Sequence, residues 1–406
     1  MISRLNSGVP GQLALFAVLA TVFVYVPFVA LILVCVFAAW GTDRSMRGVF
    51  LLAVCLLFCT LNASKQVDGD LINYVHVQSY LAGRPLLTLL DPGELTPLTP
   101  TYRSTELGFY GSQWLLAQVF DSSSASLAIA ATLAVYVPTF AAILILGRVK
   151  GWNDRLTLII ALFAFFGAIN FNNTTHLLRQ YVSGSFAFLG LVSLLDRRKY
   201  AGLAWAIVAC SVHNGTAYVV LCFAVLAALF PYGRPFWSRP WGSGLRLLTA
   251  LGVLGGSCVL LWVHELSGLL ELSDITIWRY LVTAGLFAAF WYFSRVHGMD
   301  RADYYLSVAF LVAFFISGFF FALRLQVMAL RYFVYLEWLY APMVAGILCA
   351  IPRRHVGAYL ASRWLVCCAA ICIFILHMYS SAWQYGPDTT RVLGISAREA
   401  MEYIGT

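Results

Sequence analysis

The chain has 406 residues, of which 61% are apolar and only 11% are charged. A soluble globular domain is roughly half apolar and about a quarter charged, so the excess of apolar side chains here must face lipid. The composition therefore excludes a soluble enzyme or binding module and predicts one all-α polytopic membrane domain over residues 1–406. The net charge of +8 does not indicate nucleic-acid binding, because the basic residues lie in short loops between apolar runs.

A helix needs roughly 20 apolar residues to cross the hydrocarbon layer, and about twelve segments are candidates for such spans. The segment 203–212 is the weakest, and it could be a half-span that meets the next helix near His213. In chain order the candidates are residues 13–40, 49–63, 127–146, 156–170, 177–195, 203–212, 216–230, 247–263, 277–293, 305–323, 332–350 and 364–380.

The loops between these spans alternate between basic and less basic. By the positive-inside rule the basic loops face the cytoplasm, so the N-terminus, the long loop 64–126 and the C-terminal tail lie outside. The basic loops carry Arg44 and Arg47; Arg148, Lys150 and Arg155; Arg197, Arg198 and Lys199; Arg234, Arg239 and Arg246; Arg295 and Arg301; Arg353, Arg354 and Arg363. Ionisable residues near the outer helix ends are the first candidates for chemistry, because hydrocarbon tolerates them only against a bundle interior or a wet cavity.

The loop 64–126 is too apolar and aromatic for a disordered linker, and its periodicity predicts short interfacial helices over 70–82 and 106–120. Asp70 would stand at the start of the first, with Tyr74 one turn along the same face. Asp70 could serve as a base, hold a substrate hydroxyl, or only cap the helix. Asp68 and Asp70 could also ligate a divalent cation. That pattern is common by chance, and we expect neither a metal nor a cofactor.

The second loop helix follows Arg103 and Glu106, which are three residues apart and could pair on one face. An exposed pair of this kind contributes little, and the alternative is a capped interfacial helix. Glu106 becomes a candidate because its segment is expected to pack back toward the membrane.

One helical stripe would hold His176, Arg179, Gln180 and Ser183, whose offsets are three, four and seven residues. A polar stripe on an apolar helix is expected to face the bundle interior. The alternative for Arg179 is a helix-end arginine that extends to the headgroups. Arginine suits a diphosphate because its planar fork makes bidentate, charge-assisted hydrogen bonds.

His213 lies between two apolar runs, where a neutral imidazole could accept a proton from an attacking hydroxyl or could be a packing residue. Further along, Arg324 and Arg331 bracket an outer loop, and Tyr335 lies one turn below Arg331. These residues could form an anion site or belong to an interfacial belt.

Taken together, Asp70 with Tyr74, Glu106-Leu107-Gly108-Phe109, Leu178-Arg179-Gln180 and His213 after a short basic loop resemble the EpsG family of bacterial exopolysaccharide and O-antigen assembly, which is similar in role to Wzy-type polymerases. The resemblance extends from about Asp70 to Glu337.

The resemblance implies a GT-C-like glycosyltransferase in the bacterial inner membrane, with its active face outside the cytoplasm. Donor and acceptor would both be undecaprenyl-diphosphate-linked oligosaccharides, and a flippase or a chain-length regulator would be candidate partners. Arg179, Arg324 or Arg331 would stabilise the leaving diphosphate, and His213, Asp70 or Glu106 would act as base. The alternatives are a transporter of lipid-linked glycans, an O-antigen ligase and a sugar acyltransferase.

Overall fold

The computed structural model describes residues 45–65, 69–90, 105–120, 123–170, 177–233, 248–259, 276–351 and 356–380, with Thr21 and Thr174. Within these ranges the chain is helical and contains no strand. The helices are α3 (Ser45–Ala63), α4 (Gly69–Leu81), η2 (Leu86–Leu90), α6 (Leu107–Phe120), α7 (Ser124–Val149), α8 (Asp154–Leu162), η3 (Phe163–Ala168), α10 (Leu178–Leu195), α11 (Lys199–Val212), α12 (Asn214–Leu229), α14 (Ile277–Val296), α15 (Arg301–Ala322), α16 (Gln326–Ala350) and α17 (Val356–Ser380).

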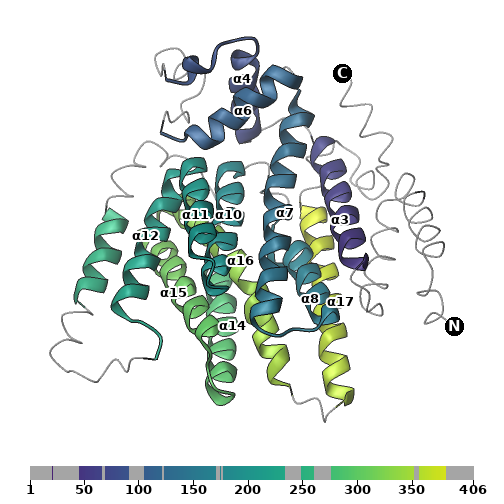
Figure 1. The fold of residues 1–406 in the computed structure, drawn as a ribbon, viewed down its shortest axis with the longest axis vertical. Coiled ribbons are helices and arrows are strands. Elements are labelled where there is room, and N and C mark those ends of the chain that lie inside the picture. Colours follow the sequence, from purple (N-terminus) through teal and green to yellow (C-terminus); the bar gives the residue numbers. More distant parts are fainter. Residues whose placement is uncertain are drawn as a thin grey trace.

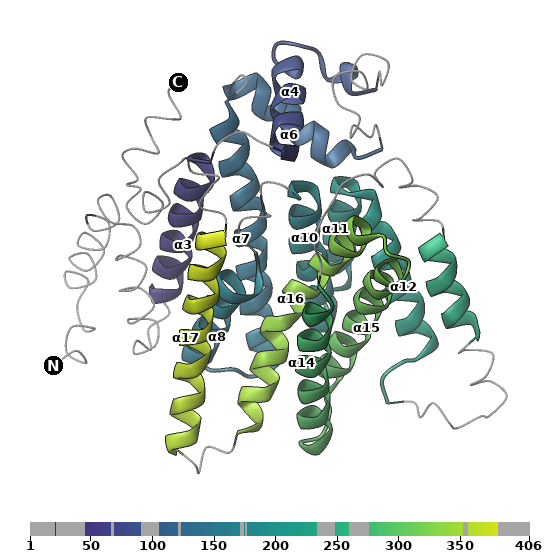
Figure 2. The same ribbon diagram turned by 180° about the vertical axis from the view of Figure 1, so that it is seen from behind.

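Most of these helices run side by side along the long axis of the molecule (Figure 1). The view from behind shows the same bundle, with α4 and α6 beyond one end of it (Figure 2). We call this the α4/α6 end. The starts of α7, α10, α12 and α16 lie toward it, whereas the starts of α8, α11 and α15 lie at the opposite end.

The described helices confirm the prediction of a helical multi-pass membrane protein. Among the described residues, five helical segments are long and apolar enough to cross a membrane: Ser124–Val149, Leu178–Leu195, Arg301–Ala322, Gln326–Ala350 and Leu360–Met378. Four shorter apolar helices accompany them: Leu51–Ala63, Lys199–Val212, Asn214–Leu229 and Leu248–Val259. The count of twelve and the GT-C architecture remain predictions, and the candidate span 13–40 lies outside the described residues apart from Thr21.

The loop helices form where the sequence places them, since α4 covers the segment predicted over 70–82 and α6 covers that predicted over 106–120. Polar caps set other helix starts. The side chains of Ser123 and Asn153 accept backbone hydrogen bonds at the starts of α7 and α8. The span predicted over 156–170 is not one regular helix, because α8 passes into the π-helix η3 and ends at Ile169 in extended backbone.

Small residues let the central helices approach closely. A side chain at Gly190 of α10 would come within 3.1 Å of the Gly202 carbonyl of α11, and one at Gly184 would come within 2.7 Å of the Trp338 ring of α16. Close backbone contact of this kind is the usual basis of helix association in membranes, where lipid provides no hydrophobic drive. α10 is therefore held on two sides, which fixes the position of its polar first turns.

At the end opposite α4 and α6, an ion-pair cluster ties α7 to α15. The Lys150 ammonium, at the C-terminal cap of α7, lies 2.6 Å from the Asp300 carboxylate and 2.7 Å from that of Asp303. Asp300 also caps α15 by accepting from the Asp303 backbone N–H. We call these three residues the Lys150 clamp.

Candidate active site

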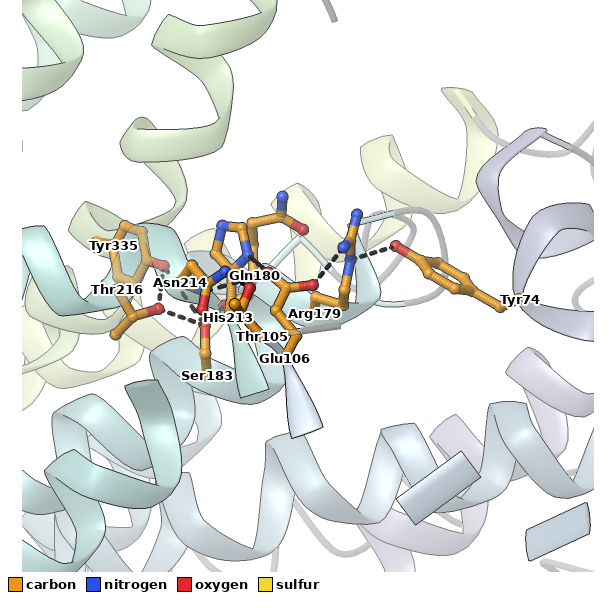
Figure 3. A network of polar contacts seen from close by, with 10 residues as sticks. All are labelled: Tyr74, Thr105, Glu106, Arg179, Gln180, Ser183, His213, Asn214, Thr216 and Tyr335. Carbon is orange, nitrogen blue, oxygen red and sulfur yellow. Dashed lines mark hydrogen bonds and ion pairs between the residues drawn. The ribbon is translucent and has the colours of Figure 1, made fainter. Parts of the chain in front are cut away.

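Glu106 is the centre of a buried polar network at the α4/α6 end of the bundle (Figure 3). One carboxylate oxygen accepts from the Arg179 guanidinium of α10. The other lies 2.7 Å from His213 Nδ1 and accepts from the Asn214 backbone N–H at 3.2 Å. Only 2% of the Glu106 residue surface is exposed. A single carboxylate thus joins three segments that are far apart in the sequence.

His213 is a one-residue break between two helices. α11 ends at Val212 and α12 begins at Asn214, while His213 itself has extended backbone, with φ −148° and ψ 120°. The two helices therefore meet at His213, while the interpretation of residues 203–212 as a half-span stays a prediction. The break gives the imidazole a direction that a continuous helix would not allow, and it places Nδ1 on Glu106.

The Glu106 bond also sets the tautomer of the ring. An ionised carboxylate only accepts hydrogen bonds, so Nδ1 must carry the proton and, in the neutral ring, Nε2 keeps the lone pair. A side chain at Gly215 would come within 2.8 Å of both His213 Nε2 and the Tyr332 hydroxyl. Glycine at this position therefore keeps a side chain from pressing on the basic nitrogen, and Tyr332 of α16 lies nearby.

Arg179 is held by the loop helices as well as by Glu106. Its Nε donates to the Tyr74 hydroxyl of α4 at 3.2 Å, and the guanidinium carbon lies 5.8 Å from the centre of the Tyr74 ring. Glu106 comes into position because α6 packs tightly on α11, where a side chain at Gly108 would overlap Ser211. The site therefore forms only when the loop helices are seated on the bundle.

Opposing effects act on the Glu106 carboxyl. Burial alone would raise its pKa, but the Arg179 charge and the His213 hydrogen bond outweigh burial and lower the pKa to about 2. Glu106 is therefore ionised throughout the physiological pH range. A base of such low pKa is a weak proton acceptor, so Glu106 is better suited to orient and to balance charge.

A second, uncharged cluster adjoins His213. The Tyr335 hydroxyl of α16 lies 2.6 Å from Thr216 Oγ1, which donates to Ser183 Oγ at 2.9 Å. The Thr216 backbone N–H in turn donates to the His213 carbonyl at 3.1 Å. Gln180 lies in the same region, and its buried side-chain oxygen accepts no hydrogen bond from the described residues.

The structure thus brings together six of the residues selected from the sequence: Tyr74, Glu106, Arg179, Gln180, His213 and Tyr335. Arg331 lies one turn before Tyr335 in α16, and Arg324 is exposed in the turn between α15 and α16, where its φ is 60°. In the part of the chain that the structure describes, no three His, Cys, Asp or Glu side chains group as metal ligands.

Other predicted residues lie outside the described set. Asp70 is the second residue of α4, but its side chain is not described, and neither Arg103 nor His176 is described at all. α10 begins at Leu178, so the stripe that was predicted to start at His176 is established only from Arg179 onward. The described partners of Glu106 are Arg179 and His213, and the predicted pairing with Arg103 lies outside the described residues.

Sequence reasoning missed Thr216 and Tyr332. Both lie three residues from a residue that was selected, Thr216 after His213 and Tyr332 before Tyr335. Helical spacing from the selected residue was therefore an available signal, since positions three apart share a helix face.

Comparison with known proteins gives one match to a protein family. Residues 48–232 match the family model of the EpsG family, which confirms the resemblance drawn from the sequence. This family is associated with polysaccharide polymerase-like membrane proteins, so the match points to a membrane protein of polysaccharide biosynthesis. No curated protein and no solved structure was found to match. The matched region ends before Arg324, Arg331 and Tyr335, whose selection therefore rests on sequence pattern and geometry.

Proposed function

Because the region that matches the EpsG family also supplies Glu106, Arg179 and His213, we propose that the protein is a glycosyltransferase that polymerises lipid-linked oligosaccharide repeat units. Donor and acceptor are both carried on undecaprenyl diphosphate, and the reaction takes place at the extracytoplasmic face of a bacterial inner membrane. The observation that carries this proposal is the Glu106 carboxylate, which holds a histidine and an arginine at once.

In the proposed reaction, a hydroxyl of the acceptor glycan attacks the anomeric carbon of the donor. The bond between that carbon and the diphosphate oxygen breaks, and the bonding pair leaves with the lipid diphosphate. The proton of the acceptor hydroxyl passes to His213 Nε2, because Glu106 fixes the other ring nitrogen as a donor. The Gln180 side-chain oxygen, which accepts no hydrogen bond from the described residues, is a suitable acceptor for a second sugar hydroxyl.

Arg179 stabilises the negative charge of the leaving diphosphate. Negative charge grows on the diphosphate as the bond breaks, and a preorganised guanidinium in a water-poor site stabilises that charge. Glu106 and Tyr74 hold the fork of Arg179 in place before substrate binds. Arg331 would add a second cation from α16, one turn nearer the helix start than Tyr335.

The helix lengths support a recessed site. α11 has 14 residues and α12 has 16. They rise about 21 and 24 Å, less than the roughly 30 Å of hydrocarbon. If their distant ends lie at the cytoplasmic interface, as the basic loop at Arg197–Lys199 indicates, His213 lies below the outer headgroups. A sugar–diphosphate junction at the membrane surface could reach such a site with its lipid still in the bilayer.

The test is reconstitution of the purified protein in liposomes with an undecaprenyl-diphosphate-linked repeat unit. Polymerisation gives a ladder of products that differ by one repeat and releases undecaprenyl diphosphate. A unit that crosses the bilayer unchanged would identify a transporter and overturn the proposal. Transfer only to added lipid A would identify a ligase, which shares the donor chemistry but not the acceptor.

A further inference from the structure

A groove runs along the bundle between α10 and α12, bordered by α15 and α16. At the end of the groove nearer to α4 and α6, which we call its upper end, is a narrow apolar cavity of about 90 Å³ whose lining includes Gly184, Val219, Ala313 and Tyr335. At the end opposite α4 and α6 is a larger cavity of about 620 Å³. Leu191, Leu194 and Phe223 line both cavities, so the two adjoin.

The mouth of the larger cavity is basic. Arg197, Lys199 and Arg301 line it together with Tyr305, and the guanidinium of Arg301 lies 5.7 Å from the centre of the Tyr305 ring. The walls above these cations are apolar. A ligand that fits has an anionic head and a hydrocarbon tail.

Nearby carboxylates do not neutralise the three cations. Asp196 lies 2.9 Å from Arg198, and Asp300 and Asp303 are bound by Lys150. In the described part of the chain none of Arg197, Lys199 and Arg301 forms an ion pair with a carboxylate. The positive charge of the mouth is therefore available to a ligand.

The backbone of Arg197 is a separate observation. It has φ of 63°, the left-handed conformation that usually ends a helix with glycine. An arginine here carries a backbone cost that glycine would avoid. Such a residue is a candidate for a role of its side chain rather than of its backbone.

We propose that this groove binds an anionic glycerophospholipid of the cytoplasmic leaflet. Its phosphate lies among Arg197, Lys199 and Arg301, and an acyl chain extends between α10 and α12 toward Tyr335. Basic pockets between membrane helices at the cytoplasmic side are the usual sites for anionic headgroups. Because Tyr335 closes the upper end and is hydrogen-bonded to Thr216, the lipid stabilises the helices that carry the candidate active site.

Native mass spectrometry of the delipidated protein with phosphatidylglycerol tests the inference. Each cation near the membrane surface contributes about 1 kcal/mol, which is about fivefold in affinity. Arg197→Gln should weaken binding about fivefold, and the triple change Arg197→Gln, Lys199→Gln, Arg301→Gln roughly 100-fold. Arg198→Gln is the matched control, since Arg198 is a neighbour that pairs with Asp196 and does not line the cavity.

Two further variants test the contribution of the acyl-chain cavity and distinguish a loss of lipid binding from a loss of protein stability. Ala309→Phe, which narrows the apolar cavity without changing the charge, should also weaken binding. Arg197→Gly, which suits the left-handed backbone, should keep or raise the melting temperature of the lipid-free protein while weakening binding as Arg197→Gln does.

Equal affinity for phosphatidylglycerol and zwitterionic phosphatidylethanolamine would overturn the inference, as would equal losses in Arg198→Gln and Arg197→Gln. Undecaprenyl phosphate that displaces phosphatidylglycerol at lower concentration would assign the groove to the polyprenyl carrier instead. None of these results depends on polymerisation, so the lipid site and the proposed function fail separately.

Discussion

The molecule carries a cluster of paired charges toward each end of the bundle, and the two clusters differ in balance. At the α4/α6 end, Glu106 serves two basic partners, Arg179 and His213. At the opposite end, the Lys150 clamp sets one cation against two carboxylates. Only the first cluster contains a side chain whose ordinary pKa lies near neutrality, and only the first suits binding of an anion.

The clusters also differ in what they connect. The Lys150 clamp ties the end of one long helix to the start of another, and Asp300 is at the same time a helix cap. The Glu106 cluster ties loop helices to the bundle, and Gly215 lies directly against the imidazole, where a larger residue would not fit. Paired charge alone therefore does not identify a reactive site. The proton-accepting group is the feature that makes the Glu106 cluster the candidate active site.

The largest expected effect belongs to Glu106→Gln. The amide keeps the volume but cannot hold the His213 N–H and the Arg179 cation as a carboxylate does, so polymer formation should fall by roughly 10²–10⁴-fold. Initial rates from single-repeat substrate measure this. If the rate stays within about threefold of wild type, the Glu106 network is structural, as the Lys150 clamp is.

Arg179→Lys should lower the rate by about 10²–10³-fold. Lysine keeps the charge but cannot donate from one planar fork to both Tyr74 and Glu106. The same assay measures the effect, with Arg198→Lys as control at an exposed arginine of the opposite end. A wild-type rate in Arg179→Lys would show that the positive charge suffices and that the planar guanidinium geometry has no role.

Gly215→Ala should slow the reaction by roughly 10- to 100-fold, because the added methyl displaces His213 Nε2 or the Tyr332 hydroxyl. Gly252→Ala is the matched control, since a side chain there meets nothing within 4 Å. The expected signature is a lower turnover rate in a protein that melts normally. Equal turnover rates of Gly215→Ala and Gly252→Ala would show that His213 Nε2 takes no part in the reaction.

Lys150→Gln tests the other side of the comparison. It leaves two neighbouring carboxylates without their cation, and the free energy of unfolding should fall by about 1.5–3 kcal/mol. The rate per folded molecule should not change. Thermal denaturation in detergent measures stability, and the polymerisation assay corrected for folded protein measures activity. A large loss of specific activity would show that the Lys150 clamp and the Glu106 cluster act together in the reaction.

The smallest expected effect is on stability in acid. The pKa of Glu106 is lowered to about 2 in the folded protein, so its contribution to stability is complete above the ordinary carboxyl value of about 4.5 and is lost as pH falls toward 2. The melting temperature of wild type should therefore decline more steeply than that of Glu106→Gln between pH 4.5 and 2. Parallel curves would contradict the lowered pKa.

Local features were predictable from the sequence. The helix over 106–120, the break at His213 and the selection of Arg179 all follow from hydrophobic runs and from the cost of ionisable groups in lipid. The partners of Glu106 were not predictable, because they lie 73 and 107 residues away in the chain. Sequence spacing identifies pairs within one helix, whereas contacts between helices depend on packing such as that of Gly108 on Ser211.

The break at His213 also sets the electrostatic surroundings of the ring. His213 is the N-cap of α12, where the helix dipole places partial positive charge beside the ring. A newly protonated ring is thus attracted by Glu106 and repelled by α12 at the same time. In the proposed reaction, the ring that receives the proton therefore lies between a full negative charge on Glu106 and a partial positive charge at the start of α12.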